Sequence, residues 1–505
     1  MSAVSVPVNP FLPLDEYIPD GEPHVFGDRV YLFGSHDEEG GDTYCPLDYV
    51  FYSAPIDDLS NWTNNGVNYR AQQDPGYSNR RPYLFAPDVV RGNDGRYYLY
   101  YSLAGPKGSG GYSGPISVAV SDAPDGQYEY LGNIRNADGT VYDEHVLFDP
   151  AVINDDGQIR LYYGACYPFD DLPAWLRPLT YPIQTKIFGK SRARIKAVDS
   201  IFGAMAVELA DDMLTVTNIP QRIIPTKTKG TEFEGHSFWE ASSIRKIGST
   251  YYFVYSSIKS HELCYATSEF PDRGFVYRGT IVSNGDVVFE GRKPEDRVNQ
   301  TGTNHGSIEQ LGSQWFVFYH RNTHGSRWSR QACVEPITIL PDGSVPQVEI
   351  TSTGFHDGPL LADGRYSAMI CSSLRKGRMP HGPARWRSVP TISSDDVDRF
   401  VGDITSGTVI GYKRFRFDGP TELSIRTRGN GTGGLLVSID NEAVSTVSIG
   451  PSTDWTRRAV RVERAGVGEL TFSYSGRGSI DLLDIEFAPL GEELATAPHR
   501  RASAP

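Results

Sequence analysis

A hairpin headed by a polar or proline residue is repeated five times along the first two thirds of the chain. Each copy has a short apolar strand, a turn that contains glycine, and a second strand rich in aromatic residues. The copies are Asp20 to Phe33, Pro87 to Tyr101, Asp149 to Tyr163, Glu240 to Tyr255 and His305 to Tyr319. Repeats of this size, each with several short strands, predict a five-bladed β-propeller.

The head residues of four copies occupy nearly the same position in the repeat. Asp20, Asp149 and His305 each stand 11 residues before the same position of the second strand. Glu240 stands 12 residues before it, which predicts one extra residue in the turn. Because a propeller brings equivalent strand positions to a common axis, we expect three carboxylates and a histidine to converge at one end of a central channel.

Three acidic residues in register favour a shared site. An acidic residue at the start of a strand often only caps a turn, and for a single residue that is the better interpretation. Two carboxyl groups that face one cleft act as acid and base when their environments push their pKa values apart. Glycoside hydrolysis uses such a pair, and a third carboxylate would raise the pKa of the acid. Asp20, Asp149 and Glu240 supply three such groups.

The charge of the chain limits its partners. It has 48 Lys and Arg against 62 Asp and Glu, a formal net charge of −14. An acidic chain lacks the basic face that neutralises phosphate groups, so we expect no nucleic-acid partner. No apolar run has the length of a transmembrane helix, so we expect no membrane partner. Nothing in the sequence indicates an oligomeric state.

Two observations predict a cytoplasmic location. Residues 1–13 lack a basic stretch followed by an apolar core, so no signal peptide is expected. The five cysteines are scattered without CxxC or zinc-type spacing, and their odd number is typical of thiols in a reducing compartment.

The repeat ends near residue 357, where a different pattern of strands follows. We expect residues 1–357 to form the propeller and residues 358–398, rich in Gly, Pro, Ser and Arg, to form a connector. Alternating segments over residues 399–490 predict a jelly-roll-like β-sandwich, and the polar residues 491–505 predict a disordered tail. The fold class expected for the whole chain is therefore all-β.

Residues 167–203 interrupt the repeat and lengthen the step between the third and fourth heads to 91 residues. We expect a partly helical insertion at the edge of a blade. It is either a solvated loop or a rim that shapes substrate access.

The acidic residues lie in motifs that resemble glycoside hydrolase family 43. The motifs are Tyr17-Ile18-Pro19-Asp20, Phe148-Asp149-Pro150-Ala151-Val152 and Phe238-Trp239-Glu240-Ala241-Ser242-Ser243. The resemblance covers about residues 9–355 and implies a five-bladed propeller, an inverting mechanism and no cofactor for the chemistry. It implies that Asp20 is the general base, that Glu240 is the general acid, and that Asp149 tunes the pKa of Glu240 and helps to hold the sugar.

The resemblance also implies residues that bind the sugar or an ion. Phe85 stands where the family usually has the Trp of a Trp-Ala-Pro motif, a change that affects stacking on the sugar. His305 is expected at the axis, where it contacts the substrate, a structural calcium ion or a water cluster; the alternative is a hydrogen-bonded core histidine. Arg330 resembles an arginine that contacts sugar hydroxyls, and the alternative is a surface salt bridge.

Residues 400–490 resemble a family 6 carbohydrate-binding module. Tyr412 and Trp455 are its candidate sugar-binding aromatics, although both suit a core equally well. The sandwich is therefore expected either to bind sugar or to brace the propeller.

These observations predict an inverting exo-glycosidase that hydrolyses terminal α-L-arabinofuranosyl residues of plant-type oligo- or polysaccharides. A β-xylosidase, or a bifunctional enzyme, is the alternative, because the two sugars present similar hydroxyl positions to one pocket. A retaining fructan hydrolase is a weaker alternative, because its nucleophile motif is not found. A sugar-binding propeller with inactive carboxylates is the non-enzymatic alternative.

Overall fold

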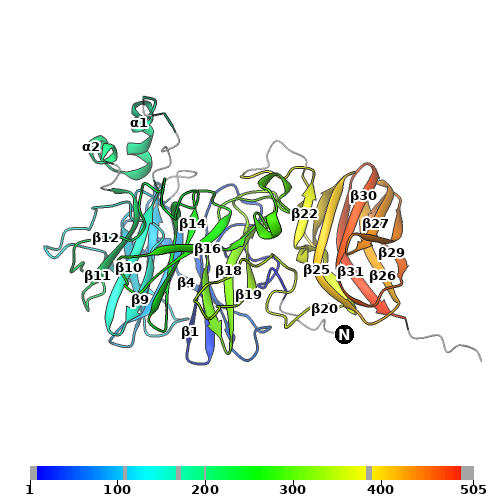
Figure 1. Cartoon of the computed structure of the whole chain (residues 1–505), viewed down its shortest axis with the longest axis horizontal. Helices are drawn as coiled ribbons and strands as arrows, with labels where there is room; N and C mark the ends of the chain where they lie inside the picture. The colour runs from blue at the N-terminus through cyan, green and yellow to red at the C-terminus, as the bar shows by residue number, and fades with distance from the viewer. Residues whose placement is uncertain are drawn as a thin grey trace, which may run out of the picture.

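The computed structural model describes residues 8–105, 111–166, 172–173, 175–197, 201–382 and 389–490. They form a β-propeller and a β-sandwich that lie side by side (Figure 1). The prediction of an all-β chain with a propeller followed by a sandwich is confirmed. The predicted tail at 491–505 lies outside the described residues.

In the described part of the chain, four blades have four antiparallel strands and the fifth has three. Blade one comprises β1 (Glu22–Phe26), β2 (Arg29–Phe33), β3 (Tyr49–Pro55) and β4 (Thr63–Tyr69). Blade two comprises β5 (Tyr83–Arg91), β6 (Tyr97–Ala104), β7 (Ile116–Ser121) and β8 (Glu129–Asn133). Blade three comprises β9 (Ala151–Asp155), β10 (Gln158–Ala165), β11 (Gly203–Leu209) and β12 (Gln221–Arg222). Blade four comprises β13 (Phe238–Ile247), β14 (Thr250–Ser257), β15 (Glu262–Ser268) and β16 (Val276–Ser283). Blade five comprises β17 (Ser307–Leu311), β18 (Gln314–Asn322) and β19 (Arg330–Ile337).

The first two strands of every blade are the predicted hairpin. The glycine of each turn has a positive φ, which glycine adopts without steric strain; these are Gly27, Gly95, Gly157, Gly248 and Gly312. Side chains of the hairpins fill the space between blades, as Tyr100 and Tyr163 do between blades two and three. The hairpins are therefore the repeating unit of the propeller, and they also provide side chains of the apolar core between its blades.

The extra residue in the fourth hairpin lies in a β-bulge. Glu240 pairs with Ser256 and Ser243 pairs with Val254, so β13 has one residue more than β14 over this step. Ala241, inside the bulge, has a φ of 67°. The prediction that the turn holds the extra residue is therefore wrong. A bulge bends a strand and re-aims its side chains, and this one lies at Glu240 itself.

The insertion contains α1 (Arg177–Phe188) and α2 (Arg192–Lys196), which stand above the propeller in Figure 1. Its predicted partly helical character is confirmed. Lys190 and Arg194 both bond to Asp143, which fastens the insertion to the preceding loop. Ile187 and Phe188, at the end of α1, line the cavity of the candidate active site described below, so the insertion forms a rim.

The sandwich consists of two six-stranded sheets around one apolar core. One sheet contains β20 (Leu360–Leu361), β22 (Ser373–Lys376), β25 (Thr408–Phe417), β27 (Thr432–Ile439), β28 (Glu442–Ile449) and β30 (Gly466–Arg477). The other contains β21 (Gly364–Ser367), β23 (Thr391–Ser394), β24 (Arg399–Ile404), β26 (Thr421–Gly429), β29 (Ser452–Val462) and β31 (Ile480–Pro489).

The expected connector at 358–398 supplies four of these strands, so the prediction of a connector is wrong. Strands of two to four residues are too short to show alternation, and pairing with β25, β31 and β24 makes them strands.

The two candidate aromatics of the sandwich have structural partners. Tyr412 is fully buried, and its hydroxyl donates to the carbonyl of Ala368. The Trp455 indole donates to Asp398, and its ring lies beneath the Arg428 guanidinium, 4.2 Å from the ring centre. Tyr412 is therefore a core residue, and one face of Trp455 is covered.

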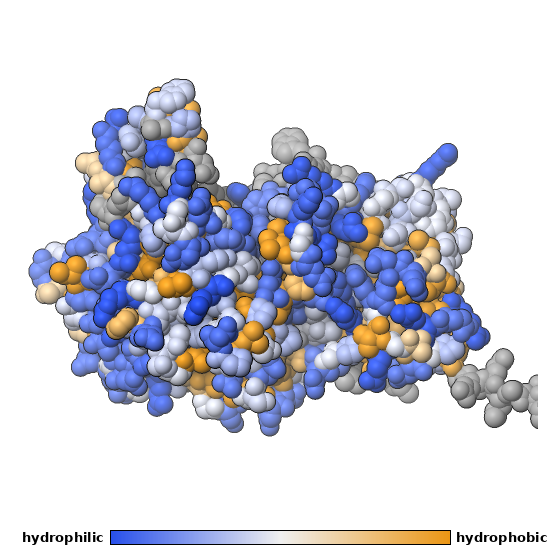
Figure 2. Space-filling model, in the orientation of Figure 1, coloured by the Kyte–Doolittle hydropathy of each residue, from blue (hydrophilic) through white to orange (hydrophobic). Residues whose placement is uncertain are grey.

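Hydrophilic residues dominate the face in Figure 2, with small separate apolar patches. Among the described residues, no helix combines the length and the apolar character needed to cross a membrane.

Candidate active site

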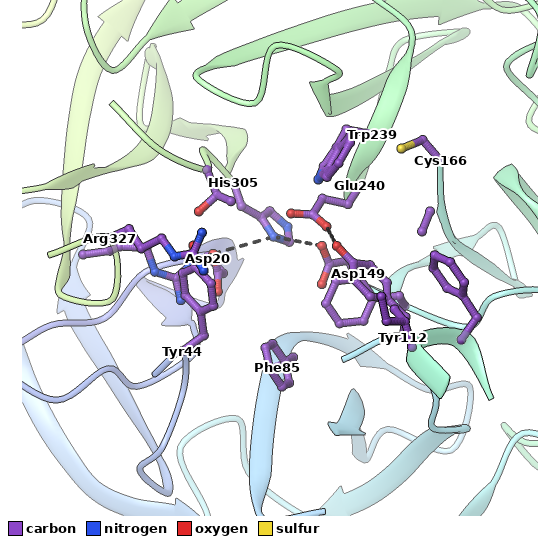
Figure 3. A pocket seen from close by; sticks show the side chains of 16 residues that line it. Asp20, Tyr44, Phe85, Tyr112, Asp149, Cys166, Trp239, Glu240, His305 and Arg327 are labelled. Atoms are coloured by element: carbon purple, nitrogen blue, oxygen red, sulfur yellow. Dashed lines mark hydrogen bonds and ion pairs between the residues drawn. The ribbon is translucent and has the colours of Figure 1, made fainter. Parts of the chain in front are cut away.

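The six residues that the sequence singles out line one cavity of about 340 Å³ (Figure 3). They are Asp20, Phe85, Asp149, Glu240, His305 and Arg330. Asp20, Asp149 and His305 each lie two residues before the innermost strand of a blade, and Glu240 lies in the bulge of β13. The repeat therefore brings these groups together from four blades.

Two neighbouring residues, Arg330 and His320, fix the position of Asp20. Arg330 Nη1 donates to Asp20 Oδ1 at 2.8 Å. The Asp20 backbone N–H donates to His320 Nδ1 at 3.2 Å, while His320 Nε2 lies 2.8 Å from the carbonyl of Thr303, to which it donates. Burial lowers the pKa of His320 to about 3, so its ring is neutral near pH 7. The backbone of Asp20 has a φ of 58°, a strained conformation that these contacts stabilise.

Arg330 links two buried carboxylates. Its Nε donates to Asp37 Oδ2 at 2.7 Å and its Nη2 donates to Asp37 Oδ1 at 3.0 Å, a two-pronged pair, while Nη1 holds Asp20. Burial is the largest effect on the pKa of Asp20 and would raise it, but the guanidinium charge, together with smaller effects of His320, His305 and Ser35, outweighs it, and the pKa lies below its ordinary value. Arg330 is 4% exposed, so the alternative of a surface salt bridge is wrong.

Asp149 and Glu240 form a second acidic group. Asp149 Oδ2 accepts the Ala241 N–H at 2.9 Å, and Glu240 Oε2 accepts the hydroxyl of Tyr112. Burial raises the pKa of Glu240 to about 7, with the charge of Asp20 acting in the same direction. Burial and the charge of Glu240 raise the pKa of Asp149. The two carboxyl groups therefore resist ionising together and retain a proton near neutral pH.

His305 lies between the two acidic groups. Figure 3 shows Asp20 on one side of the ring, and Asp149 with Glu240 on the other. His305 Nδ1 is 3.6 Å from Asp149 Oδ2 and 3.9 Å from Asp20 Oδ1. Burial lowers the pKa of His305 to about 4, so the ring is neutral at pH 7.

The second ring nitrogen of His305, Nε2, is available to a ligand at the propeller axis. Nε2 is buried and has no hydrogen bond to any described residue, and the same is true of Glu22 Oε1. Glu22, His24 and Asp88 bring their ligand atoms within 4.8 Å of one another, and the charge of Asp88 acts on His305. Calcium prefers carboxylate and other oxygen ligands. These donors therefore fit a calcium ion at the axis, and they fit a water cluster equally.

The walls of the cavity are largely aromatic, with Tyr44, Phe85, Tyr112, Phe148, Phe188 and Trp239. Phe85 packs beside Phe148 with ring centres 5.6 Å apart, so it is part of a wall on which a sugar can pack. Sequence reasoning missed Tyr44, Tyr112 and Phe188, which lie in loops or the insertion and have no place in the repeat. His320 was also missed, although it lies near the end of the second strand of the fifth hairpin.

The arrangement suits proton transfer in both directions. An ionised carboxylate at Asp20 accepts a proton, and a carboxyl group at Glu240 with a pKa near 7 donates one.

Comparison with known proteins identifies relatives of this chain. Residues 9–170 match the family model of glycosyl hydrolases family 43. A xylosidase/arabinosidase from Thermoclostridium stercorarium is 41% identical over 494 residues, which are 94% of this chain and 97% of the relative. An arabinoxylan arabinofuranohydrolase from Paenibacillus polymyxa is 23% identical, over 92% of this chain and 71% of the relative.

A solved structure agrees with this result. The propeller resembles a family 43 β-xylosidase/α-arabinofuranosidase from a compost microbial metagenome, in complex with xylotriose and in a calcium-free form. The TM-score is 0.50 and the identity is 26%, over 66% of this chain and 94% of that chain. Together with the match along nearly the whole of the Thermoclostridium protein, this shows that the chain belongs to glycosyl hydrolases family 43 and is a glycoside hydrolase.

Proposed function

We propose that this enzyme is an inverting exo-glycosidase that releases terminal α-L-arabinofuranosyl residues from arabinoxylan-type oligo- or polysaccharides. One observation carries the proposal: Asp20, with a lowered pKa, and Glu240, with a pKa near 7, line one cavity on opposite sides of His305. An inverting enzyme needs an acid and a base far enough apart to admit a water molecule beside the sugar.

The proposed mechanism moves two protons. The Asp20 carboxylate, kept ionised by Arg330, accepts a proton from the water that attacks the anomeric carbon. Glu240 donates its proton to the glycosidic oxygen as the bond from that carbon to the leaving group breaks. Asp149 and Glu240 repel each other when both are ionised, so the pair retains the proton that Glu240 donates. Asp149 also accepts the Ala241 N–H, which fixes the bulge that carries Glu240. Solvent then exchanges a proton with each residue to reset the site.

The shape of the cavity supports action on a chain end. Its volume of about 340 Å³ is near the lower limit for small-molecule pockets, which is about 300 Å³. Ile187 and Phe188 of the insertion close one side of it. A terminal sugar fits such a pocket better than an internal residue of a polymer does.

The identity of the sugar rests on the relatives. The Thermoclostridium protein is named for both xylosidase and arabinosidase, and the Paenibacillus protein for arabinofuranose release. A β-xylosidase, or a bifunctional enzyme, is the second candidate, because the compost enzyme bears both names and was solved with xylotriose. A sugar-binding propeller without activity would not need the opposite pKa shifts of Asp20 and Glu240.

Three further points are proposals. Because two carboxyl groups carry both proton transfers, the mechanism requires no cofactor. A calcium ion, if bound at the axis, would use His305 Nε2 as its protein nitrogen ligand and would stabilise the propeller at its centre. A cytoplasmic location also stays a prediction, with short imported oligosaccharides as substrates.

The test compares 4-nitrophenyl α-L-arabinofuranoside, 4-nitrophenyl β-D-xyloside and arabinoxylo-oligosaccharides for the wild type and Glu240→Gln. We expect the wild type to prefer the arabinofuranoside. On the oligosaccharides the variant loses about 10²- to 10⁴-fold in kcat/KM, because the leaving oxygen needs a proton. On the nitrophenyl substrate the loss is smaller, because nitrophenolate leaves without help.

Glu234→Gln is the matched control, because Glu234 is exposed and its carboxylate accepts the N–H of Gly230 within its own loop. It should retain wild-type rates. Equal rates of Glu240→Gln and wild type on the oligosaccharides would refute the role of Glu240. Proton NMR of the first product identifies its anomer, and retention of configuration would refute the inverting mechanism. A preference for the xyloside would make the second candidate correct.

A further inference from the structure

We propose that the sandwich shapes the active-site cavity by holding the two loops that form one side of its wall. The first loop, residues 34–48, joins β2 to β3, and the second, residues 323–329, joins β18 to β19. The contact of Arg399 with Glu39 and the contact of strand β23 with Thr323 are the two links. The inference deepens the proposed function and rests on it, because it assigns a role in substrate binding to this cavity.

The two loops contribute neighbouring side chains to the cavity. Tyr44 belongs to the first loop and Arg327 to the second, and both line the cavity. The Arg327 guanidinium lies 5.6 Å from the centre of the Tyr44 ring. In Figure 3 the two residues lie on the same side of the cavity as Asp20. Movement of either loop would therefore change the wall next to the base.

The loops are also bonded to each other. Ser326 Oγ donates to the carbonyl of Gly41 at 3.2 Å, and Ser329 Oγ donates to the carbonyl of Glu38 at 3.0 Å. These bonds join the loops by way of backbone carbonyls within a few residues of Tyr44. A contact that restrains either loop therefore also restrains the other.

The sandwich bonds to each loop separately. Arg399, the first residue of β24, donates from Nε and Nη2 to the two carboxylate oxygens of Glu39, each at 3.0 Å. This fork geometry fixes orientation as well as distance. β23 is the edge strand of its sheet, and the Ile392 N–H donates to the carbonyl of Thr323 at 3.0 Å. Thr391 Oγ1 donates to the same carbonyl at 3.3 Å.

Other contacts hold the sandwich to the propeller without these two links. Lys413 pairs with Glu349 at 2.8 Å and with Asp286 at 3.4 Å, and Arg321 Nη1 donates to the carbonyl of Cys371 at 2.9 Å. Because Arg399 is partly exposed, its removal should change global stability little. The contact of Arg399 can therefore be tested without separating the two parts.

The general base has its own support. The Asp37 N–H donates to the carbonyl of Tyr17. The Asp37 carboxylate accepts hydrogen bonds from Arg330, and Arg330 in turn donates to Asp20. Loosening of the loop around Glu39 should therefore move Tyr44 and leave Asp20 ionised. The effect expected is weaker substrate binding with an unchanged chemical step, so Arg399 is a positioning residue.

The experiment measures kcat, KM and the acid limb of the pH profile for Arg399→Gln. We expect KM to rise about three- to tenfold, kcat to stay within about twofold, and the acid limb to stay in place. Arg457→Gln is the matched control, because Arg457 makes a similar exposed pair with Glu422 on the sandwich, at 2.6 Å, away from the loops. The exchanged pair Glu39→Arg with Arg399→Glu should recover part of the lost affinity, whereas either reversal alone should not.

Hydrogen exchange provides a readout that needs no substrate. Peptides from residues 34–48 and 323–329 should exchange faster in Arg399→Gln than in the wild type, and Thr391→Val should have the same effect on 323–329. Unchanged KM and unchanged exchange in Arg399→Gln would overturn the inference, as would equal effects in Arg457→Gln. If the wild type proves inactive on every sugar, the proposed function fails, and the exchange result alone decides whether the sandwich holds the loops.

Discussion

Tyr112 is the residue on which the protonation of Glu240 depends most directly. Burial raises the pKa of Glu240 to about 7, and the hydrogen bond from the Tyr112 hydroxyl opposes this effect, because it favours the ionised carboxylate. The general acid works only while it is protonated. Activity should therefore be lost as the pH rises through the pKa of Glu240, and Tyr112 sets where that loss occurs.

Tyr112→Phe should move the alkaline limb of the kcat/KM profile to higher pH, by about one pH unit, since the ionised form of Glu240 loses a donor. The acid limb, which reports Asp20, should not move. Tyr98→Phe is the control, because the Tyr98 hydroxyl donates to a surface carboxylate, that of Asp94, at 2.7 Å. An alkaline limb that stays in place, or moves to lower pH, would show that Tyr112 does not tune the acid.

The hairpin is the element that sequence predicts best in this protein. Its alternating apolar residues and its turn glycine are local signals, and the repeat fixes its register, so the sequence alone places Asp20, Asp149 and His305 at the axis. The bulge at Ala241 could not be placed, because one extra residue fits a turn or a bulge equally well in a sequence. Tyr44 could not be predicted, because a 15-residue loop has no period that would fix where its side chains point.

Helix α1 shows a second limit at the scale of elements. Its sequence leaves open whether the insertion is a solvated loop or a rim of the site, and most of its side chains are at least partly exposed, including Leu179 at 73%. Phe188 at its end is 2% exposed and packs between Tyr112 and Phe202, with ring centres 5.6 and 4.9 Å away. One buried aromatic residue thus connects the insertion to the tyrosine that bonds to Glu240.

Phe188→Ala should lower kcat/KM about tenfold, because the wall beside Tyr112 loses its support and the substrate is held less well. Leu179→Ala changes an exposed residue of the same helix and should leave kcat/KM unchanged. Steady-state kinetics on the preferred aryl glycoside, with circular dichroism to confirm folding, tests both. If the two variants behaved alike, the insertion would have no part in the site.

Closure of the propeller ring is the feature of the whole molecule on which the site depends. Residues 8–18 pack between blades one and five, where Phe11 and Ile18 share one cluster with Leu32 of β2 and Phe318 of β18. Asp20 belongs to the first blade and Arg330 to the fifth, so the ion pair that keeps the base charged spans the seam of the ring. Opening of this seam would separate the base from its guanidinium.

Asn9 fastens the seam. Its Nδ2 donates to the Val334 carbonyl at 2.7 Å and its Oδ1 accepts the Val334 N–H at 2.9 Å, both without exposure to solvent. Asn9→Ala leaves these groups of Val334 without the side chain, which should lower the free energy of unfolding by about 2–4 kcal/mol. Thermal inactivation of glycosidase activity should then occur several degrees lower than in the wild type, while kcat at 25 °C should change little. Asn93→Ala removes a comparable but exposed amide, which bonds to Gly157 between blades two and three, and should have no such effect. Equal inactivation temperatures for Asn9→Ala and Asn93→Ala would mean that the ring is closed by the apolar cluster alone.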